Sequence, residues 1–230
     1  MVPVNGIRTI TLDLDDTLWE IHPVIRRAEI RLYEWLGENY PGITEMYTIE
    51  QMRILRNDIF ERVPDKLHDL TFLRHAVLTE AATAAGYPQF EVDEAFAVFD
   101  EVRNDVDLFP ESRPTLVALA KRYTLIAVTN GNANLEKIGI DDLFDHHVSA
   151  AKAGAAKPHR QIFDAAVSVG GASAAETLHV GDDPHTDIHG ALGAGLRAAW
   201  VNRNGNVWPN ELQAPDMTVG HVGELLDILL

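Results

Sequence analysis

Residues 7–18 read Ile-Arg-Thr-Ile-Thr-Leu-Asp-Leu-Asp-Asp-Thr-Leu, so an apolar segment runs directly into three aspartates. The β-branched and apolar residues favour a strand that is buried on both faces, as strands of parallel sheets are. Carboxylates inside such a core would lose hydration that apolar packing cannot return. We therefore expect Asp13, Asp15 and Asp16 at the carboxyl end of the strand, where a cation or a shared proton relieves their repulsion.

The composition is that of a globular protein with enough apolar residues for a packed core. The chain has 230 residues, 46% of them hydrophobic, and no cysteine, which excludes a disulfide framework and a thiolate zinc site. Its net charge of −16 argues against a nucleic-acid partner. Because no apolar segment approaches the roughly 20 residues that span a bilayer, and none resembles a signal peptide, we expect a cytoplasmic location and no membrane partner.

The pattern of apolar residues divides the chain into an α/β part and a helical insert. From residue 19 to 107 apolar residues return every three or four positions, with turn residues such as Pro41-Gly42 between them, which predicts a bundle of about four helices. From Pro110 helix and strand patterns alternate, as in a parallel sheet with right-handed crossovers. We therefore predict a Rossmann-like parallel-sheet core at 1–18 and 108–230, interrupted by a helical domain at 19–107.

Several elements of the predicted core can be bounded from the residues. We expect strands at Tyr123–Val128, Thr177–Val180 and Arg197–Val201, and helices at Leu116–Lys121, His159–Val169, His185–Ala194 and Gly220–Leu230.

Three of the predicted strands are followed by polar clusters. These are Asp13 to Thr17, then Thr129-Asn130-Gly131, then Gly181-Asp182-Asp183 with Asp187 four residues later. The carboxyl ends of parallel strands meet along one edge of the sheet, so we expect these clusters to converge there. Lys157 precedes Pro158 at the start of a predicted helix, a position that attracts anions.

This mixture of groups fits phosphoryl transfer to a carboxylate. Mg²⁺ prefers hard oxygen ligands and commonly bridges protein carboxylates to a substrate phosphate. Asp13 and Asp15 are candidates for the nucleophile and the general acid/base. Lys157 and the Thr129 hydroxyl can hold the other oxygens of the transferred group.

The four clusters together resemble the motifs of haloacid dehalogenase superfamily phosphatases, which begin with Asp-x-Asp-x-Thr. The resemblance implies a Mg²⁺-dependent phosphomonoester hydrolase that forms an aspartyl-phosphate, with Asp13 as nucleophile and Asp15 as acid/base. It implies phosphate binding by Thr129, Asn130 and Lys157. The helical insert resembles the α-helical cap domain of this superfamily.

The resemblance also implies the metal ligands. They are Asp13, Asp182 and Asp15, the last through its backbone carbonyl. Asp183 and Asp187 contact the metal either directly or through other groups, and both alternatives stay open.

Four short segments narrow the resemblance to the bacterial flavin-mononucleotide phosphatase branch. They are Leu12 to Leu18, His22-Pro23-Val24-Ile25, Val128 to Asn132, and Leu178 to Asp183. Members of this branch dephosphorylate flavin mononucleotide or the phosphoribitylamino-pyrimidine precursor of riboflavin. The implied partner is a small phosphorylated metabolite of this kind. No oligomeric state is predicted.

Other residues allow more than one interpretation. Trp19 and His22 lie between the first motif and the insert, where they either contact substrate or pack at a hinge. His179, His185 and His189 are compatible with a transition-metal site, but the oxygen-rich clusters favour Mg²⁺. The insert arginines lie on predicted helices with apolar opposite faces, and we expect a solvated helix face for each of them: Arg26, Arg53, Arg56 and Arg74.

Three other functions use similar residues. A haloacid dehalogenase attacks carbon with the same aspartate but has no need of Asp15. A phosphomutase uses the same acids as a phosphatase. A phospho-acceptor signalling module would keep a long-lived aspartyl-phosphate, although receiver-like domains lack a large helical insert.

Overall fold

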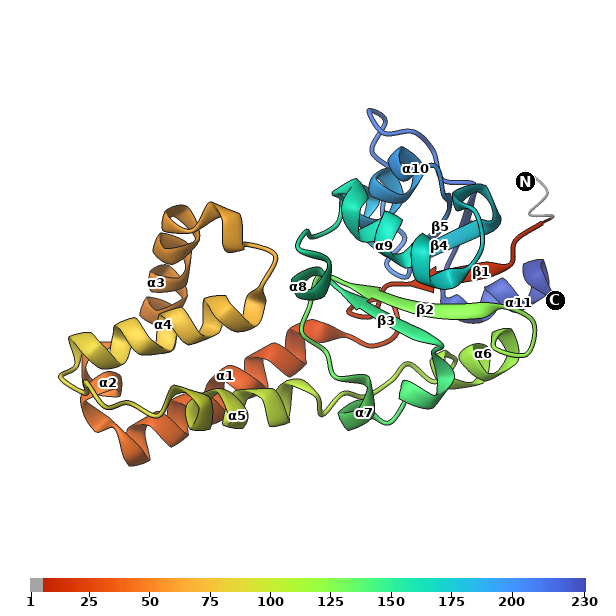
Figure 1. Cartoon of the computed structure of the whole chain (residues 1–230). Coiled ribbons are helices and arrows are strands. Elements are labelled where there is room, and N and C mark those ends of the chain that lie inside the picture. Colours follow the sequence, from red (N-terminus) through yellow and green to blue (C-terminus); the bar gives the residue numbers. More distant parts are fainter. Residues whose placement is uncertain (1–5) are drawn as a thin grey trace. The chain divides into compact units, whose positions relative to one another are not determined.

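The computed structural model describes residues 6–230, which form two compact units. One unit comprises residues 6–20 with Asp107–Leu230, and the other comprises Ile21–Val106. The first contains a six-stranded parallel sheet with helices around it, and the second consists of helices (Figure 1). The predicted α/β class with a parallel-sheet core and a helical insert is confirmed. Within residues 6–230, no helix has both the length and the apolar character needed to cross a membrane.

The sheet places the first strand at its centre. The strand order is β3-β2-β1-β4-β5-β6, and every neighbouring pair is parallel. The strands are β1 (Thr9–Leu12), β2 (Thr124–Thr129), β3 (His146–Ser149), β4 (Thr177–Gly181), β5 (Arg197–Val201) and β6 (Met217–Val219). Leu12, the last residue of β1, is in register with Ala127 of β2 and Val180 of β4. The strand order reverses at β1, so the residues that follow these three strands share one crevice.

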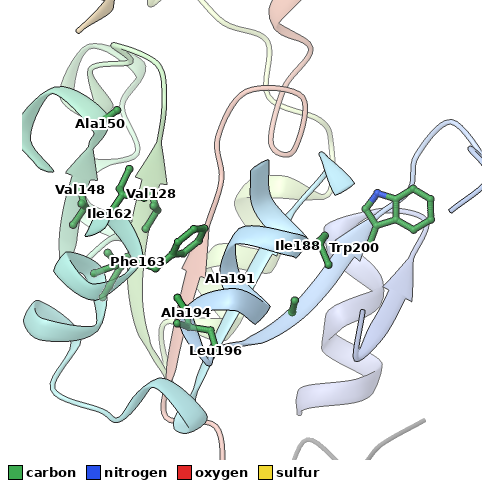
Figure 2. Close-up of a cluster of buried hydrophobic side chains, with 13 residues drawn as sticks. Val128, Val148, Ala150, Ile162, Phe163, Ile188, Ala191, Ala194, Leu196 and Trp200 are labelled. Carbon is green, nitrogen blue, oxygen red and sulfur yellow. The ribbon is translucent and has the colours of Figure 1, made fainter. Parts of the chain in front are cut away.

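Helices cover both faces of this sheet (Figure 1). The helices of this unit are α6 (Ser112–Leu119), α7 (Leu135–Ile138), α8 (Ala150–Ala153), α9 (Arg160–Gly170), α10 (Gly190–Ala194) and α11 (Leu225–Leu229), with a π-helix at Pro184–His189 and 3₁₀ turns at Asp141–Leu143, Ala174–Glu176 and Val222–Glu224. Figure 1 shows α9 and α10 on one face and α6 and α11 on the other. Phe163, Ile188 and Trp200 belong to the buried cluster that packs α9 and α10 against the strands (Figure 2). This packing keeps the loops at the strand ends in place.

The second unit is a helical bundle with its own apolar core. Its helices are α1 (Ile21–Asn39), α2 (Pro41–Met46), α3 (Ile49–Arg62), α4 (Leu70–Ala84) and α5 (Val92–Arg103), with a 3₁₀ turn at Pro64–Lys66. Leu36, Leu78 and Phe99 are buried in one cluster between α1, α4 and α5. Ile59 of α3 and Leu73 of α4 are buried in a second cluster. The predicted periodicity of the insert therefore corresponds to helix faces that pack on one another.

Three local predictions differ from the structure. Pro41 begins the short helix α2 instead of a turn, because proline at the first helical position lacks only an N–H that would have no partner there. The predicted helix from His185 to Ala194 is divided into the π-helix and α10. The C-terminal α-helix begins at Leu225, after a 3₁₀ turn, and not at Gly220. Strand β6 was not predicted, because three residues at a sheet edge carry little periodic signal.

Candidate active site

Asp13 extends the central strand by one residue into the crevice. Its N–H donates to the carbonyl of Val180 at 2.8 Å, which continues the β1–β4 hydrogen-bond pattern beyond Leu12. Asp13 is buried, with 6% of its surface exposed. Burial raises the pKa of Asp13 well above its ordinary value, the Lys157 ammonium opposes this rise, and the nearby Asp187 and Asp182 carboxylates add to it.

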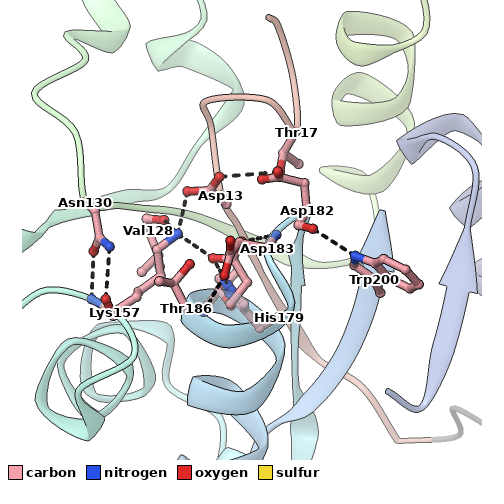
Figure 3. A network of polar contacts seen from close by, with 12 residues as sticks. Asp13, Thr17, Val128, Asn130, Lys157, His179, Asp182, Asp183, Thr186 and Trp200 are labelled. Atoms are coloured by element: carbon pink, nitrogen blue, oxygen red, sulfur yellow. Dashed lines mark hydrogen bonds and ion pairs between the residues drawn. The ribbon is translucent and has the colours of Figure 1, made fainter. Parts of the chain in front are cut away.

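The ammonium of Lys157 lies between two carboxylates at the end of the sheet (Figure 3). Its Nζ donates to Oδ1 of Asp13 and to the carbonyl of Val128 at 3.0 Å, and it lies 2.7 Å from Oδ1 of Asp187. Burial alone would lower the pKa of Lys157, but the charges of Asp13 and Asp187 raise it above its ordinary value. The side chain is therefore a buried cation whose charge is balanced by two acids.

Asn130 holds the backbone of Lys157 in position. Its Oδ1 accepts from the N–H of Lys157 at 2.7 Å, and its Nδ2 donates to the carbonyl of Lys157 at 3.0 Å (Figure 3). Because Asn130 follows β2, this pair of bonds ties the lysine loop to a strand end. The geometry gives Asn130 a positioning role, and its predicted phosphate contact stays a prediction.

Asp187 is held by partners on three sides. Its Oδ1 lies 3.3 Å from Nε2 of the fully buried His179, whose Nδ1 lies 2.8 Å from the hydroxyl of Thr11. Its Oδ2 accepts from the backbone N–H of Asp183 at 3.0 Å. Burial would raise the pKa of Asp187, but Lys157 and His179 hold it below its ordinary value. Burial lowers the pKa of His179, although its contact with Asp187 opposes the shift.

Asp182 stands beside this ion cluster and is connected to it through Thr17. The Thr17 hydroxyl lies 3.4 Å from Oδ2 of Asp13 and 3.3 Å from Oδ1 of Asp182. The indole N–H of Trp200 donates to the backbone carbonyl of Asp182 at 2.8 Å (Figure 3). Burial raises the pKa of Asp182 to about 7, and the charges of Asp187 and other nearby aspartates add to the rise.

The carboxylates fit a hard divalent cation. Asp13, Asp182 and Asp187 each offer an oxygen, and these oxygens lie within 4.8 Å of one another. Burial is the main cause of the raised pKa of Asp182, and the repulsion by nearby aspartates that adds to it is what a cation would relieve. An all-oxygen set of this kind suits Mg²⁺, and no histidine belongs to the three-residue group found within residues 6–230.

Asp183 has a structural task in the same loop. Its Oδ1 accepts from the N–H groups of His185 and Thr186 at 2.8 and 2.7 Å, which caps the π-helix. Of the two aspartates with open roles, the structure thus brings Asp187 into the carboxylate group and uses Asp183 as a cap.

Asp15 and Trp19 form a pair just beyond the nucleophile candidate. The indole N–H of Trp19 donates to Oδ1 of Asp15 at 2.9 Å, and Trp19 is fully buried. A ring with no exposed face cannot stack on a substrate, so this geometry supports the packing alternative for Trp19. His22 is exposed near the start of α1 in the helical unit, and its substrate contact stays a prediction.

Thr129 lies at the end of β2 with its hydroxyl toward the following loop. Its side chain is buried, and Oγ1 accepts from the N–H of Gly131 at 2.9 Å. A hydroxyl that accepts in this way still has its own hydrogen to donate. The predicted phosphate contact of Thr129 is compatible with this arrangement and stays a prediction.

The comparison with protein families decides the class. A family model described as haloacid dehalogenase-like hydrolase matches residues 7–195, which includes every cluster described above. The chain belongs to the haloacid dehalogenase-like hydrolase family. The family resemblance and the enzyme class predicted from the sequence are confirmed.

This hydrolase is similar to named phosphatases and dehalogenases. It is 32% identical to the 5-amino-6-(5-phospho-D-ribitylamino)uracil phosphatase YigB of Escherichia coli (strain K12), over 99% of this chain and 98% of YigB. It is 26% identical to haloacetate dehalogenase H-2 of Moraxella sp. (strain B), over 94% of this chain and 95% of that protein. The crystal structure of a 2-haloacid dehalogenase from Pseudomonas syringae pv. Tomato DC3000 matches with a TM-score of 0.92 and 37% identity, over 97% of this chain and 98% of that one.

Two residues of the hydrolase site were not predicted in their observed roles. Thr11 faces His179 across the β1–β4 register, and Trp200 faces Gly181 across the β4–β5 register. Each contact depends on which strands are neighbours, and this order is not visible in the spacing of residues along the chain. The registers of β1 with β4 and of β4 with β5 would be needed to predict both contacts.

Proposed function

We propose that this hydrolase is a Mg²⁺-dependent phosphomonoesterase that works through an aspartyl-phosphate. The observation that carries the proposal is the buried Lys157 ammonium in contact with Asp13 and Asp187, next to Asp182. A fixed cation of this kind can hold the anionic group of a substrate against an anionic nucleophile. Bound by Asp13 and Asp182, with Asp187 nearby, Mg²⁺ would supply further positive charge to offset these carboxylates and the phosphate.

The proposed reaction has two steps. In the first, a carboxylate oxygen of Asp13 attacks phosphorus, the bond from phosphorus to the leaving oxygen breaks, and Asp15 donates a proton to that oxygen. In the second, Asp15 takes a proton from water as the water attacks phosphorus, and the bond to Asp13 breaks. Inorganic phosphate leaves and both aspartates return to their starting states. Lys157 and the Thr129 hydroxyl hold the oxygens that do not react.

The proposed substrate is a small phosphorylated metabolite of the flavin class. Similarity to YigB over almost the whole chain supports 5-amino-6-(5-phospho-D-ribitylamino)uracil or flavin mononucleotide as candidates. We include in this proposal a cap role for the helical unit in selecting the leaving group, and a cytoplasmic location.

A second candidate is a 2-haloacid dehalogenase, which the similarity to the Pseudomonas syringae structure favours. In that reaction Asp13 would attack the carbon that carries the halogen, and halide would leave. This chemistry has no task for Asp15, whereas phosphoryl transfer uses it as acid and base.

A substrate panel with the purified protein separates these functions. The panel contains flavin mononucleotide, the ribitylamino-uracil phosphate, sugar phosphates and nucleotides, each with Mg²⁺ or with EDTA, and short 2-haloacids assayed for halide release. We expect phosphate release that requires Mg²⁺ and is strongest for the flavin-class substrates. Halide release without phosphatase activity would overturn the proposal, and metal-independent phosphate release would overturn its mechanism.

A matched pair of variants tests the nucleophile. Asp13→Asn should lower kcat by at least about a thousandfold because amide nitrogen and oxygen are poor nucleophiles. Asp142→Asn removes one exposed aspartate of the same unit and should leave kcat unchanged. Full activity of Asp13→Asn would refute the aspartyl-phosphate route.

Two remaining alternatives differ from hydrolysis in their products. Transfer of the phosphoryl group to a second position of the substrate would indicate a phosphomutase. An aspartyl-phosphate that survives for hours without turnover would indicate a signalling module.

A further inference from the structure

Three arginines of the helical unit converge on one small cavity. Arg53 and Arg56 of α3 and Arg74 of α4 line it, together with the carboxylate of Glu29 from α1. The remaining wall is mostly apolar and consists of Leu32, Tyr33, Ile49, Met52 and Val77. The expected solvated helix face is wrong for Arg56 and Arg74, because the packing of α3 against α4 turns them toward one space, whereas the Arg53 side chain is 41% exposed and agrees with the expectation.

The charges around this cavity do not balance. Both Nε and Nη2 of Arg53 donate to Oε2 of Glu29, at 3.1 and 2.5 Å, so the one lining carboxylate already has a partner. Arg53 also pairs with Glu50 at 3.1 Å, so two carboxylates stand against the three positive charges of Arg53, Arg56 and Arg74. This local excess occurs in a chain whose net charge is −16, so it does not follow from the overall composition.

The two additional guanidiniums have unused hydrogen-bonding capacity. The Nε atom of Arg56 is buried and has no hydrogen-bond partner among residues 6–230. Arg74 stacks on the ring of Phe99, with its Cζ 3.9 Å from the ring centroid. A stacked guanidinium keeps its N–H edge available for an anion. Burial lowers the pKa of Arg74 to about 10, in spite of Glu29.

We propose that Arg56 and Arg74 form a binding site in the helical unit for the carboxylate or phosphate end of a small organic anion. The enclosed space is about 20 Å³, which admits a group of about the size of one water molecule. A single anionic oxygen of the ligand fits there, where it can accept charge-assisted hydrogen bonds from the guanidiniums. This inference concerns residues 21–106 alone and does not depend on the phosphoryl chemistry of the sheet unit.

The methionines provide local reporters for a test on the full chain. Met52 lines the cavity, whereas Met217 is buried in β6 of the other unit. Inorganic phosphate and acetate are titrated separately into Mg²⁺-free protein with ¹³C-labelled methionine methyl groups, at constant ionic strength. We expect a saturable shift of the Met52 signal with at least one anion. A shift of the Met52 signal with phosphate alone, with acetate alone, or with both would identify which anionic group the site accepts.

Three variants show whether the arginines bind the anion. Arg56→Gln and Arg74→Gln should each raise the dissociation constant of the anion about tenfold or more, since each removes a charge-assisted hydrogen bond. Arg62 lies on the same helix as Arg56 but pairs with Glu80 outside the cavity. Arg62→Gln should therefore leave the dissociation constant unchanged. If loss of the Arg74 stack unfolds the helical unit, the Arg56→Gln arm still gives the answer. An unshifted Met52 signal, or equal constants in wild type and both glutamine variants, would overturn the proposal.

Discussion

The carboxylate of Asp187 lies directly against the Cα of Gly181, and a Cβ added to Gly181 would lie 2.4 Å from Cγ of Asp187. Gly181 ends β4, and Asp187 lies in the π-helix that follows. The same carboxylate lies 2.7 Å from the ammonium of Lys157. A residue without a side chain at the strand end thus determines where the central ion pair of the site can form.

Gly181→Ala should therefore displace Asp187 and with it Lys157. We expect kcat to fall at least about tenfold and the free energy of unfolding to fall by about 1–3 kcal/mol, as in other overpacked sites. Phosphatase kinetics at saturating substrate and urea unfolding measure the two effects. Gly193→Ala is the matched control, because a Cβ there meets nothing within 4 Å. It should lower neither kcat nor the free energy of unfolding. Normal kcat and stability in Gly181→Ala would contradict the argument.

Asp16 has a backbone requirement of its own. Its φ is 62°, in the left-handed region that Asp and Asn tolerate and that β-branched residues avoid. Asp16→Val should lower the free energy of unfolding by about 1–2 kcal/mol more than Asp16→Asn does. Both substitutions remove the same charge, so the difference in urea unfolding excludes the charge and reports the backbone conformation together with any polar contact that Asn keeps and Val loses. Equal stabilities of the two variants would show that the turn into the helical unit does not depend on this conformation.

The central strand and its carboxylates were predictable because their causes are local. An apolar run between residues 7 and 12 favours burial, and the cost of burying carboxylates places Asp13 beyond the strand. The convergence of Lys157 with Asp13 was expected only through motif order and the rule for parallel strand ends. The roles of His179 and Trp200 depend on strand neighbours, and no local pattern encodes them.

In the helical unit too, the cavity lined by the arginines depends on which elements are neighbours, and no local sequence pattern encodes this. Arg56 is three residues before Ile59, and Arg74 is three residues before Val77, so each arginine shares a helix face with an apolar residue. Only the packing of α3 on α4 places both on one cavity. Tertiary contacts between helices thus changed the interpretation of residues that the periodicity alone had placed in solvent.

The raised pKa of Asp182 gives the metal-free protein a defined pH dependence. Its pKa of about 7 in the folded state lies above the ordinary value of 3.8, because burial and nearby carboxylates disfavour its charge. Between these two values the folded state binds more protons than the unfolded state, so stability falls as pH rises, by on the order of 1 kcal/mol per pH unit. The raised pKa of Asp13 acts in the same direction, the lowered pKa values of the buried His179 and of His147 act in the opposite direction, and the lowered pKa of Asp187 acts only at lower pH.

Between about pH 4 and about pH 7 in EDTA, the wild type should therefore lose stability relative to Asp182→Asn as pH rises, and the difference between their melting temperatures measures this contribution. Saturating Mg²⁺ at pH 7 should restore stability, because it binds the ionised carboxylates of the folded state. Asp182→Asn removes the titrating group and leaves the histidine contributions in place. A pH dependence in EDTA that is the same in wild type and Asp182→Asn would contradict the assigned pKa direction.

Trp200 offers a test of how the position of Asp182 affects metal binding. Its indole N–H donates to the carbonyl of Asp182 at 2.8 Å, and its ring packs edge-on against Trp208 with centroids 5.0 Å apart. Trp200→Phe keeps an aromatic ring and removes the donor. Since one neutral hydrogen bond contributes about 1 kcal/mol, the Mg²⁺ concentration for half-maximal activity should rise about fivefold while kcat at saturating Mg²⁺ is retained.

Trp208→Phe is the matched control for this position. It also removes an indole donor, which bonds the carbonyl of Leu212 at 3.3 Å, but it leaves the bond to Asp182 intact. Its Mg²⁺ dependence should equal that of the wild type. If both variants shift the Mg²⁺ dependence equally, the effect comes from the shared ring packing. A shift confined to Trp200→Phe assigns it to the hydrogen bond, because only that variant frees the backbone of a proposed metal ligand.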